Sequence, residues 1–292
     1  MDEDIIQINI SNFNLKHTFE SAQPIAFFAD YNYESNALTY PYMNSILKLE
    51  VSYDYNYKSN LSISLLKGSI EGSELKNEVE KRFRLFDDMD KIYSLINTDE
   101  YMNDAINQYR GMHLTINDPW EALLCFIISQ FNNVKRIRRI VKNLINRYGK
   151  SIDGGYKSFP TPLDMEKATK EELMECGSGF RADYILDAID FSLNNVELDK
   201  LNANDYYKLK DVLMEIKGVG EKVADCVVLM GYGNLEAFPI DVWVKRRMEE
   251  LYFNKEKRSI EELQDFAWDR WGNYRGYAQQ YLFHSSRKNT KQ

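Results

Sequence analysis

The most constraining feature of this 292-residue sequence is the turn Gly218-Val219-Gly220, which separates two short segments with helical spacing of apolar residues. The apolar positions that would pack the two helices together are Leu213, Ile216, Val223, Val227 and Val228. Glycine tolerates a positive φ and lets a ligand approach the backbone closely. The second helix would present free N–H groups and its positive dipole end to an anion such as phosphate. The pattern favours a helix-hairpin-helix over residues 211–230, with an ordinary corner between helices as the alternative.

Two charged residues suggest chemistry beside this turn. Lys222 lies just inside the second helix, at the end where the helix dipole disfavours a cation. Asp241 follows 19 residues later, after Pro239, and its structural alternative is a helix N-cap. A lysine amine can attack an electrophilic carbon while a carboxylate stabilises positive charge and moves protons. Cys226 shares the helix face of Lys222, although most reduced cysteines are simply small buried hydrophobes.

Charge is unevenly distributed along the chain. The formal net charge of −8 argues, taken alone, against nucleic acid as a partner. Residues 132–150 nevertheless hold no acidic residue and seven basic ones, which are Lys135, Arg136, Arg138, Arg139, Lys142, Arg147 and Lys150. This run is either a solvated helix face or a surface that follows a phosphate backbone. The second interpretation gains support because the glycine turn is an independent anion-binding signal.

Composition excludes several classes of protein. No apolar run approaches the roughly 20 residues needed to span a bilayer, so we expect no membrane partner. The acidic N-terminus is unlike a secretory signal or a transit peptide. Cys125, Cys176 and Cys226 are odd in number and far apart, which favours reduced thiols and argues against a disulfide framework or an iron–sulfur cluster. We expect an intracellular monomer that acts with the genome, in the cytoplasm (nucleoid) if bacterial.

The chain divides into two parts of different character. Residues 1–105 contain short segments of β-branched and aromatic residues, at 5–10, 24–31, 47–55 and 61–68, followed by a helix predicted over 77–96. These predict an antiparallel sheet with one wet face. Residues 106–292 are mostly helical, and one helix is expected to begin with Asp118 as N-cap and Pro119 at its first position. The predicted fold class is α+β.

The segments GVGEKVADCVVLMG and AFPIDVWVKR resemble the signature of the helix-hairpin-helix DNA glycosylases with a Gly/Pro-rich loop and an aspartate, the HhH-GPD superfamily. Within it, the chain most resembles the 8-oxoguanine DNA glycosylases. PWEALLCFIIS, GSGFRADYI and RGYAQQYLF match that family in the same order. The resemblance implies a TBP-like antiparallel sheet followed by two all-α subdomains. It also implies damaged double-stranded DNA as the partner, and no cofactor for the chemistry.

The resemblance assigns roles in excision. Lys222 would attack C1′ of the damaged nucleotide, and Asp241 would stabilise the oxocarbenium charge. The resulting Schiff base would permit β-elimination, so the implied enzyme is both glycosylase and AP lyase. The damaged base would be flipped out and held by Cys226, Gln279, Phe283 and the carbonyl of Ala22. Ala22 replaces a glycine of the family, and its carbonyl could serve if its φ is negative.

Other residues are implied to contact DNA or a cation. Phe180 would wedge into the stack where the base has left, and Trp243 replaces a histidine that contacts phosphate. The remaining implied DNA contacts are Asn132, Asn133, Arg136, Arg181 and the backbone N–H groups of Gly218, Gly220 and Val223. The carbonyls of Met214, Ile216 and Val219 resemble those that bind a structural monovalent or calcium ion.

Phe131 departs from the family, which has an asparagine at this position for recognising the opposite cytosine. The sequence therefore predicts relaxed selectivity for the opposite base. Two alternatives remain open: a glycosylase of this fold for another damaged base, and a non-catalytic DNA-binding protein. The pairing of Lys222 with Asp241 argues against the second alternative.

Overall fold

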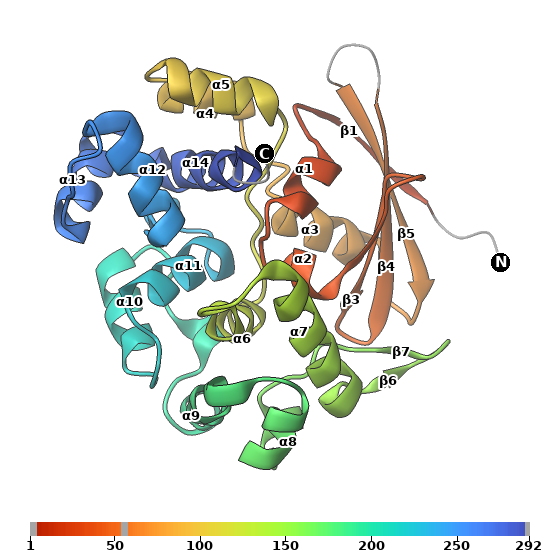
Figure 1. Cartoon of the computed structure of the whole chain (residues 1–292). Helices are drawn as coiled ribbons and strands as arrows, with labels where there is room; N and C mark the ends of the chain where they lie inside the picture. The colour runs from red at the N-terminus through yellow and green to blue at the C-terminus, as the bar shows by residue number, and fades with distance from the viewer. Residues whose placement is uncertain (1–4, 54–57, 290–292) are drawn as a thin grey trace.

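The N-terminal part of the chain forms an antiparallel sheet that stands beside a body of helices in the computed structural model (Figure 1). The structure describes residues 5–53 and 58–289. Within them, the sheet contains β1 (Ile6–Ser11), β2 (Asp30–Asn32), β3 (Ala37–Tyr42), β4 (Ser45–Tyr53) and β5 (Lys58–Lys67). The spatial order is β1-β5-β4-β3-β2, and every neighbouring pair is antiparallel. This arrangement confirms the predicted α+β class.

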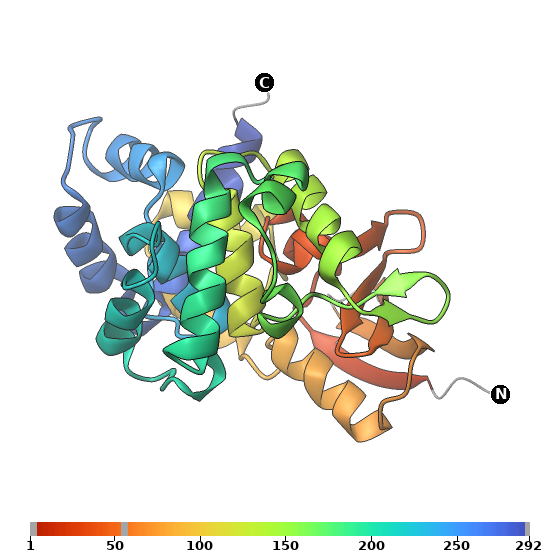
Figure 2. The ribbon, with the colours of Figure 1, turned by 90° about the horizontal axis from the view of Figure 1, so that it is seen from below.

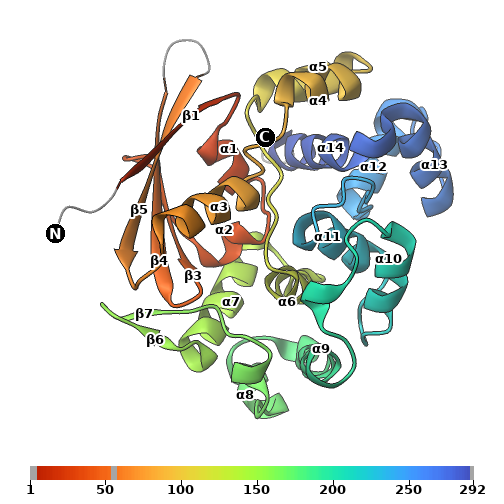
Figure 3. The same ribbon diagram turned by 180° about the vertical axis from the view of Figure 1, so that it is seen from behind.

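One face of the sheet is buried because its strands alternate in side-chain direction. Leu49 of β4 lies opposite Ile63 of β5, Val51 lies opposite Leu61, and all four side chains are buried. Helices α1 (Leu15–Glu20), α2 (Ile25–Phe28) and α3 (Gly72–Arg82) lie between the sheet and the other helices (Figures 1 and 3). The sheet therefore serves as a wall that supports the N-terminal helices against the body.

The strand predicted over residues 24–31 is wrong for most of its length. Helix α2 occupies the segment, and strand β2 begins only at Asp30. Every residue of α2 is buried, so the run is continuously apolar, a pattern from which period alone cannot distinguish strand from helix. Arg138 from the helical body donates hydrogen bonds to the carbonyls of Ala26 and Ala29. Contacts distant in sequence thus stabilise the helical turn.

The single helix predicted over residues 77–96 is divided in the structure. Helix α3 ends at Arg82, and α4 (Met89–Ile96) begins after Asp88, whose carboxylate accepts the Lys91 N–H at 3.0 Å as an N-cap. Between them Arg84 has a left-handed φ of +50° and pairs with Asp87 at 2.6 Å. A left-handed residue commonly ends a helix. The helical spacing of apolar residues therefore continues across the turn between α3 and α4, so the spacing alone does not reveal that turn.

The helical body is built around α6 (Pro119–Ser129), in which every residue from Trp120 to Ile128 is buried. The Asp118 carboxylate accepts the N–H groups of Trp120 and Glu121, and Glu121 accepts the Asp118 N–H. This capping box confirms the predicted start of the helix. Helices α7 (Val134–Tyr148), α9 (Ala182–Asn194) and α11 (Glu221–Gly231) pack against α6. Figure 2 shows α6 and α9 side by side.

The last helix, α14, joins distant parts of the chain. The further helices are α5 (Glu100–Gln108), α8 (Lys170–Glu175), α10 (Tyr206–Met214), α12 (Val242–Tyr252), α13 (Ile260–Trp271) and α14 (Arg275–Asn289), and a short hairpin pairs β6 (Ser151–Ile152) with β7 (Tyr156–Lys157). Helix α14 packs against α4, α5, α12 and α13. A domain boundary near residue 105 stays a prediction. In the described part of the chain, no helix is long and apolar enough to cross a membrane.

Candidate functional site

Helices α10 and α11 form a hairpin around the glycine turn. The Val219 N–H donates to the Ile216 carbonyl at 2.9 Å, and Gly220 is the N-cap of α11. Gly218 has a φ of +83°, and a Cβ at this residue would overlap the ring of Tyr184 from α9. A Cβ at Gly220 would meet no heavy atom within 4 Å. The first glycine is therefore needed for packing, and the second leaves the start of α11 open to an anion.

Lys222, Cys226 and Asp241 lie close together at the start of α11. Lys222 is half-buried, and its Nζ lies 5.6 Å from the ring centroid of Phe126 on α6. Cys226, one turn further along, is 5% exposed, and burial raises the pKa of its thiol to about 11. The charge of Lys222 lowers that pKa, and the charge of Asp241 raises it. The Lys222 amine and the Asp241 carboxylate therefore both lie near the buried Cys226 sulfur.

Asp241 is held in a fixed orientation by its own helix. As N-cap of α12, its Oδ1 accepts the Trp243 N–H at 3.0 Å and the Val244 N–H at 2.8 Å. The structural alternative raised for this residue is thus realised, and it positions the carboxylate rather than excluding chemistry. Trp243 is exposed on the first turn of α12, with the Arg246 guanidinium 5.6 Å from its ring. Trp243 can therefore meet a partner at the surface.

Helix α14 lies along the segment that ends at Asp241. Gln279 is 5% exposed, and its Nε2 donates to the Pro239 carbonyl at 2.9 Å. That carbonyl requires a donor, so it fixes which end of the amide faces it. The Oε1 atom is buried without a hydrogen-bond partner among the described residues. Phe283, one turn further along and half-buried, shares this helix face.

Ala22 has a φ of +62°. The negative φ that would have let its carbonyl serve in the pocket is therefore not present. A left-handed alanine costs on the order of 1–3 kcal/mol and persists where neighbours determine the backbone. The Gln23 side chain supplies this restraint by donating to the His113 carbonyl at 2.8 Å and accepting the Thr115 N–H at 2.7 Å. The Gln280 side chain donates to the Ser21 carbonyl at 2.9 Å, which fixes the segment beside α14. The position keeps a glycine-like backbone with an alanine side chain.

A row of aromatic rings runs from the loop before α7 to the hairpin. Phe131 is 94% exposed and has a left-handed φ of +47°. Its ring centroid lies 6.4 Å from that of Phe180, which is 52% exposed. Phe180 in turn lies edge-on to Tyr184 at 6.0 Å, and Tyr184 packs on Gly218. The row therefore connects the open hairpin to two apolar side chains that project into solvent.

The structure contradicts a direct DNA contact by Arg181. Its side chain is 2% exposed, and its guanidinium donates to the carbonyls of Ser178, Gln130 and Phe131. The guanidinium carbon also lies 4.4 Å from the Phe180 ring centroid. Arg181 lies beneath both exposed phenylalanines and fixes the loop that carries one of them. It is a positioning residue, and its sequence pattern could not reveal the buried carbonyls that it binds.

The basic run on α7 is mostly paired within the protein. Asn132 donates to the Ile128 carbonyl at 3.1 Å, and Asn133 is the N-cap of α7, accepting the Arg136 N–H at 3.0 Å. Four of the basic residues are paired: Arg138 with the carbonyls of Ala26 and Ala29, Lys142 with Asp30, Arg147 with Glu172 and Glu175, and Lys150 with Asp164. Lys135, Arg136 and Arg139 are exposed near the start of the helix. The part of the run that is open to a phosphate is thus narrower than predicted.

Across residues 5–53 and 58–289, no group of three or more His, Cys, Asp or Glu residues could hold a metal ion. The three cysteines are buried and form no disulfide. At the predicted cation site of the hairpin, the Ile216 carbonyl already accepts the Val219 N–H. One lone pair of that oxygen therefore remains for a cation.

Comparison with known protein families identifies the superfamily of this chain. Residues 124–273 match the model of the HhH-GPD superfamily base excision DNA repair protein. The chain belongs to the HhH-GPD superfamily. Residues 5–123 of this HhH-GPD protein match the N-terminal domain of 8-oxoguanine DNA glycosylase. The predicted family is therefore confirmed across both parts of the chain.

Individual relatives of this HhH-GPD protein agree with that assignment. The N-glycosylase/DNA lyase of Saccharomyces cerevisiae is 31% identical over 251 residues, which cover 72% of this chain and 66% of the yeast protein. The structure of MBOgg1 bound to a low-affinity DNA ligand is 30% identical with a TM-score of 0.85, and the match covers 99% of this chain and 100% of that one. The Clostridium acetobutylicum 8-oxoguanine glycosylase/lyase, bound to DNA with cytosine opposite 8-oxoG, is 28% identical with a TM-score of 0.83 and the same coverage.

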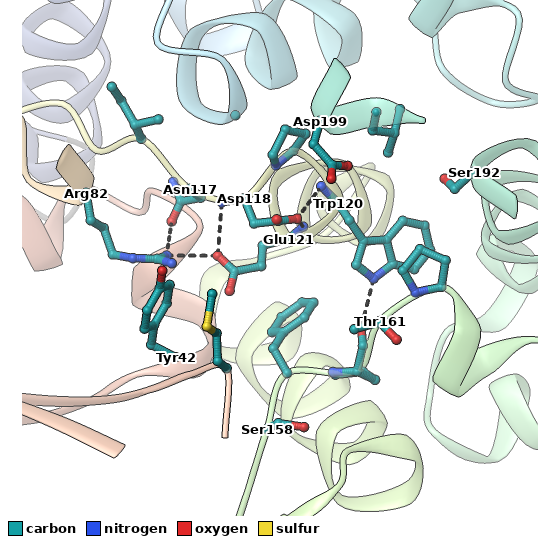
Figure 4. Close-up of a pocket in the computed structure, with 18 of the residues that line it drawn as sticks. Tyr42, Arg82, Asn117, Asp118, Trp120, Glu121, Ser158, Thr161, Ser192 and Asp199 are labelled. Atoms are coloured by element: carbon teal, nitrogen blue, oxygen red, sulfur yellow. Dashed lines mark hydrogen bonds and ion pairs between the residues drawn. The ribbon is translucent and has the colours of Figure 1, made fainter. Parts of the chain in front are cut away.

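Figure 4 shows a separate cavity of about 740 Å³ in this HhH-GPD fold. It lies where α6 begins and α11 ends, whereas Lys222 lies at the start of α11. It is lined by Asp118 and Glu121 at the start of α6 and by Gly231 at the end of α11. Arg82 and Glu78 also line it, and the buried Arg82 donates to Glu121 at 2.8 Å and pairs with Glu78. Burial raises the pKa of Glu121 to about 7, against the opposing charge of Arg82. No signal in the sequence indicated this cluster.

Proposed function

We propose that this protein is a bifunctional 8-oxoguanine DNA glycosylase and AP lyase. The observation that carries the proposal is the proximity of Lys222 and Asp241 to the buried Cys226 thiol, beside a helix with an unpaired amide oxygen at Gln279. A nucleophile, a fixed carboxylate and a base-reading group thus occur together. The family match and the two 8-oxoguanine glycosylase comparisons support the same conclusion.

Gln279 would read the flipped base through Oε1. Because one of its amide N–H groups is bonded to Pro239, the free oxygen accepts from a donor on the base. Guanine presents two adjacent donors, N1–H and N2–H, on its Watson–Crick edge, whereas adenine presents one donor, N6–H, beside the N1 acceptor. The proposed pocket therefore favours an oxidised guanine. Cys226 and Phe283 would contact the two faces of the base.

Entry of the base requires movement in the pocket. Cys226 and Gln279 are each 5% exposed, so a purine reaches them only after neighbouring side chains have shifted. Extrusion of a base from the duplex costs a few kcal/mol and is easier for a damaged pair. The Phe180 ring, 52% exposed, would fill the space that the base leaves. We infer that wedge insertion and pocket opening accompany each other.

The proposed reaction needs no cofactor. The neutral amine of Lys222 bonds to C1′ as the C1′–N9 bond breaks, and the electron pair of that bond leaves with the base, which takes up a proton. Asp241 stabilises the positive charge at C1′ and moves protons, and Oδ2 is the oxygen not held by the helix N–H groups. The sugar then opens to a Schiff base. Loss of a C2′ proton breaks the C3′–O bond, and water releases the lysine.

The hairpin would hold the backbone during these steps. The N–H groups of Gly218, Gly220 and Val223 would bind one phosphate without reading sequence. Asn132, Asn133 and Arg136 lie beside Phe131, on the loop and helix start that would face the opposite strand. Trp243 would donate its single indole N–H to a neighbouring phosphate. Because the Phe131 ring offers no hydrogen bond, we propose relaxed selectivity for the opposite base.

A cation bound by the carbonyls of Met214, Ile216 and Val219 would strengthen this grip. Its positive charge beside the turn would favour phosphate without taking part in the chemistry. Potassium or calcium ions should then raise DNA affinity above that in tetramethylammonium salt at equal ionic strength. Equal affinities in the three salts would remove the ion from the proposal.

Excision from matched duplexes tests the substrate assignment. One duplex carries 8-oxoguanine and the other carries 8-oxoadenine, so that both share the C8 carbonyl and differ at the edge that Gln279 would contact. Single-turnover excision should favour 8-oxoguanine by about ten-fold or more, because 8-oxoadenine offers Oε1 one donor beside an acceptor where 8-oxoguanine offers two donors. Equal rates would contradict the reading by Gln279. No excision of either base would contradict the proposed function.

A further inference from the structure

Arg287 extends the proposed pocket by one turn of α14. It follows Phe283 by four residues and Gln279 by eight, so the three share one helix face. Its guanidinium carbon lies 5.4 Å from the Phe283 ring centroid. Asp241 is near enough to raise the pKa of Arg287, although burial has the larger and opposite effect. The proposed pocket therefore contains a second basic side chain on the Asp241 side.

The Arg287 guanidinium has an unused donor. Its Nη1 is buried without a hydrogen-bond partner among the described residues. Arginine stays charged and carries five N–H donors in a planar fork, so a buried donor without an acceptor is unfavourable. If Arg287 served only to pack on the Phe283 ring, burying an Nη1 donor without an acceptor would bring no benefit. The unused donor indicates an acceptor that arrives with the substrate.

The spacing along α14 indicates which part of the nucleotide meets this donor. At 1.5 Å per residue, Arg287 lies roughly 12 Å along the helix axis from Gln279, with Phe283 between them. A purine stacked on Phe283 with its Watson–Crick edge toward Gln279 turns its opposite edge, which carries C8 and the sugar, toward Arg287. The neighbouring Asp241 agrees with this direction, because it would act at C1′.

We propose that Arg287 donates a hydrogen bond to an oxygen acceptor of the extruded nucleotide, either the C8 carbonyl of the base or its flanking phosphate. Both acceptors suit a guanidinium, and both lie on the side of the nucleotide that faces away from Gln279. The inference rests on the proposed function, because it uses the base position assigned there. It adds a binding residue on the sugar side of the pocket.

Equilibrium binding in a non-cleaving background tests the proposal. The parent is Lys222→Gln, and the added changes are Arg287→Gln and, in a separate protein, Arg287→Lys. The ligands are three duplexes that differ at one position: 8-oxoguanine, a tetrahydrofuran abasic analogue, and undamaged guanine. Arg147→Gln is the matched control, because that arginine is exposed and paired with Glu172 and Glu175. Melting temperatures verify that each variant is folded.

Loss of a charge-assisted hydrogen bond should weaken binding about ten-fold or more in Arg287→Gln, with partial recovery in Arg287→Lys. Weakening of both the 8-oxoguanine and the abasic duplexes would identify the phosphate, and weakening of the first alone would identify the C8 carbonyl. Less than a two-fold change on both would overturn the inference. If the parent itself fails to prefer 8-oxoguanine over guanine, the proposed function fails, and that comparison does not involve Arg287.

Discussion

Gly218 of the hairpin lies directly against the ring of Tyr184 on α9, so closely that a Cβ at residue 218 would lie less than 3.0 Å from ring atoms. Gly218 also has a φ of +83°, which disfavours any side chain. This contact connects the turn that is proposed to bind phosphate to the aromatic row that carries Phe180. The hairpin and the proposed wedge are therefore connected through the Tyr184 ring.

The two hairpin glycines should respond differently to alanine. Gly218→Ala combines a left-handed φ with steric overlap and should destabilise the protein by about 2 kcal/mol or more. Gly220→Ala has a φ of −96° and no heavy atom within 4 Å of the new Cβ, so its melting temperature should fall only slightly, because alanine is a weaker N-cap than glycine. Its Cβ would instead stand where a phosphate approaches, and DNA affinity should fall. A large loss of stability in Gly220→Ala would contradict this division of roles.

Opposite-base selectivity should depend on Phe131. Wild type should excise 8-oxoguanine opposite each of the four bases within about ten-fold, because an exposed phenyl ring offers no hydrogen bond to distinguish them. Phe131→Asn supplies donors and acceptors and should raise the preference for cytosine, whereas Phe131→Leu should not. Single-turnover rates on four duplexes measure this. A strict requirement for cytosine in wild type would refute the prediction.

Salt dependence should separate free arginines from paired ones on α7. Replacing the exposed Arg136 and Arg139 with glutamine removes two proposed phosphate contacts. The slope of log affinity against log salt should then fall by about 2, since each contact contributes about 0.9. Arg147→Gln should leave the slope unchanged, because that arginine is paired with Glu172 and Glu175. If Arg147→Gln lowered the slope as much as the double change does, the whole exposed face of α7 would contact phosphates.

Glu121 should make folding stability depend on pH. Its pKa rises from an ordinary carboxylate value to about 7 in the folded state, chiefly through burial. The unfolded chain therefore releases this proton first, and stability should decline as the pH rises from about 4.5 to 7. Glu121→Gln keeps an acceptor for the Asp118 N–H and should flatten that part of the profile. Chemical denaturation at several pH values measures it; identical profiles would contradict the assignment.

The sequence predicted the features that are local. The hairpin follows from Gly218 and Gly220, the start of α6 from Asp118 and Pro119, and the family from motifs quoted residue by residue. The errors have a common physical origin in contacts between distant segments. Arg138 fixes the helical turn at Ile25–Phe28, and buried carbonyls hold Arg181 away from solvent. Such partners leave no periodic signal.

The base pocket was assigned by resemblance, and the structure changes its details. The pattern around Gln279 and Phe283 indicated a shared helix face, but not that the Pro239 carbonyl occupies one amide donor. The left-handed φ of Ala22 depends on Gln23, whose partners lie about 90 residues away. Which side chain faces the pocket is decided by packing between α14 and the segment before α12, and a sequence pattern cannot supply that.

Trapping of the covalent intermediate tests the central claim most directly. Sodium borohydride reduces a Schiff base to a stable amine, so incubation with an 8-oxoguanine duplex should yield a protein–DNA adduct that peptide mass analysis locates at Lys222. Lys222→Gln should abolish the adduct, and Lys217→Gln, which removes an exposed lysine on the other side of the turn, should keep it. No adduct with wild type, or an undiminished adduct with Lys222→Gln, would contradict the account.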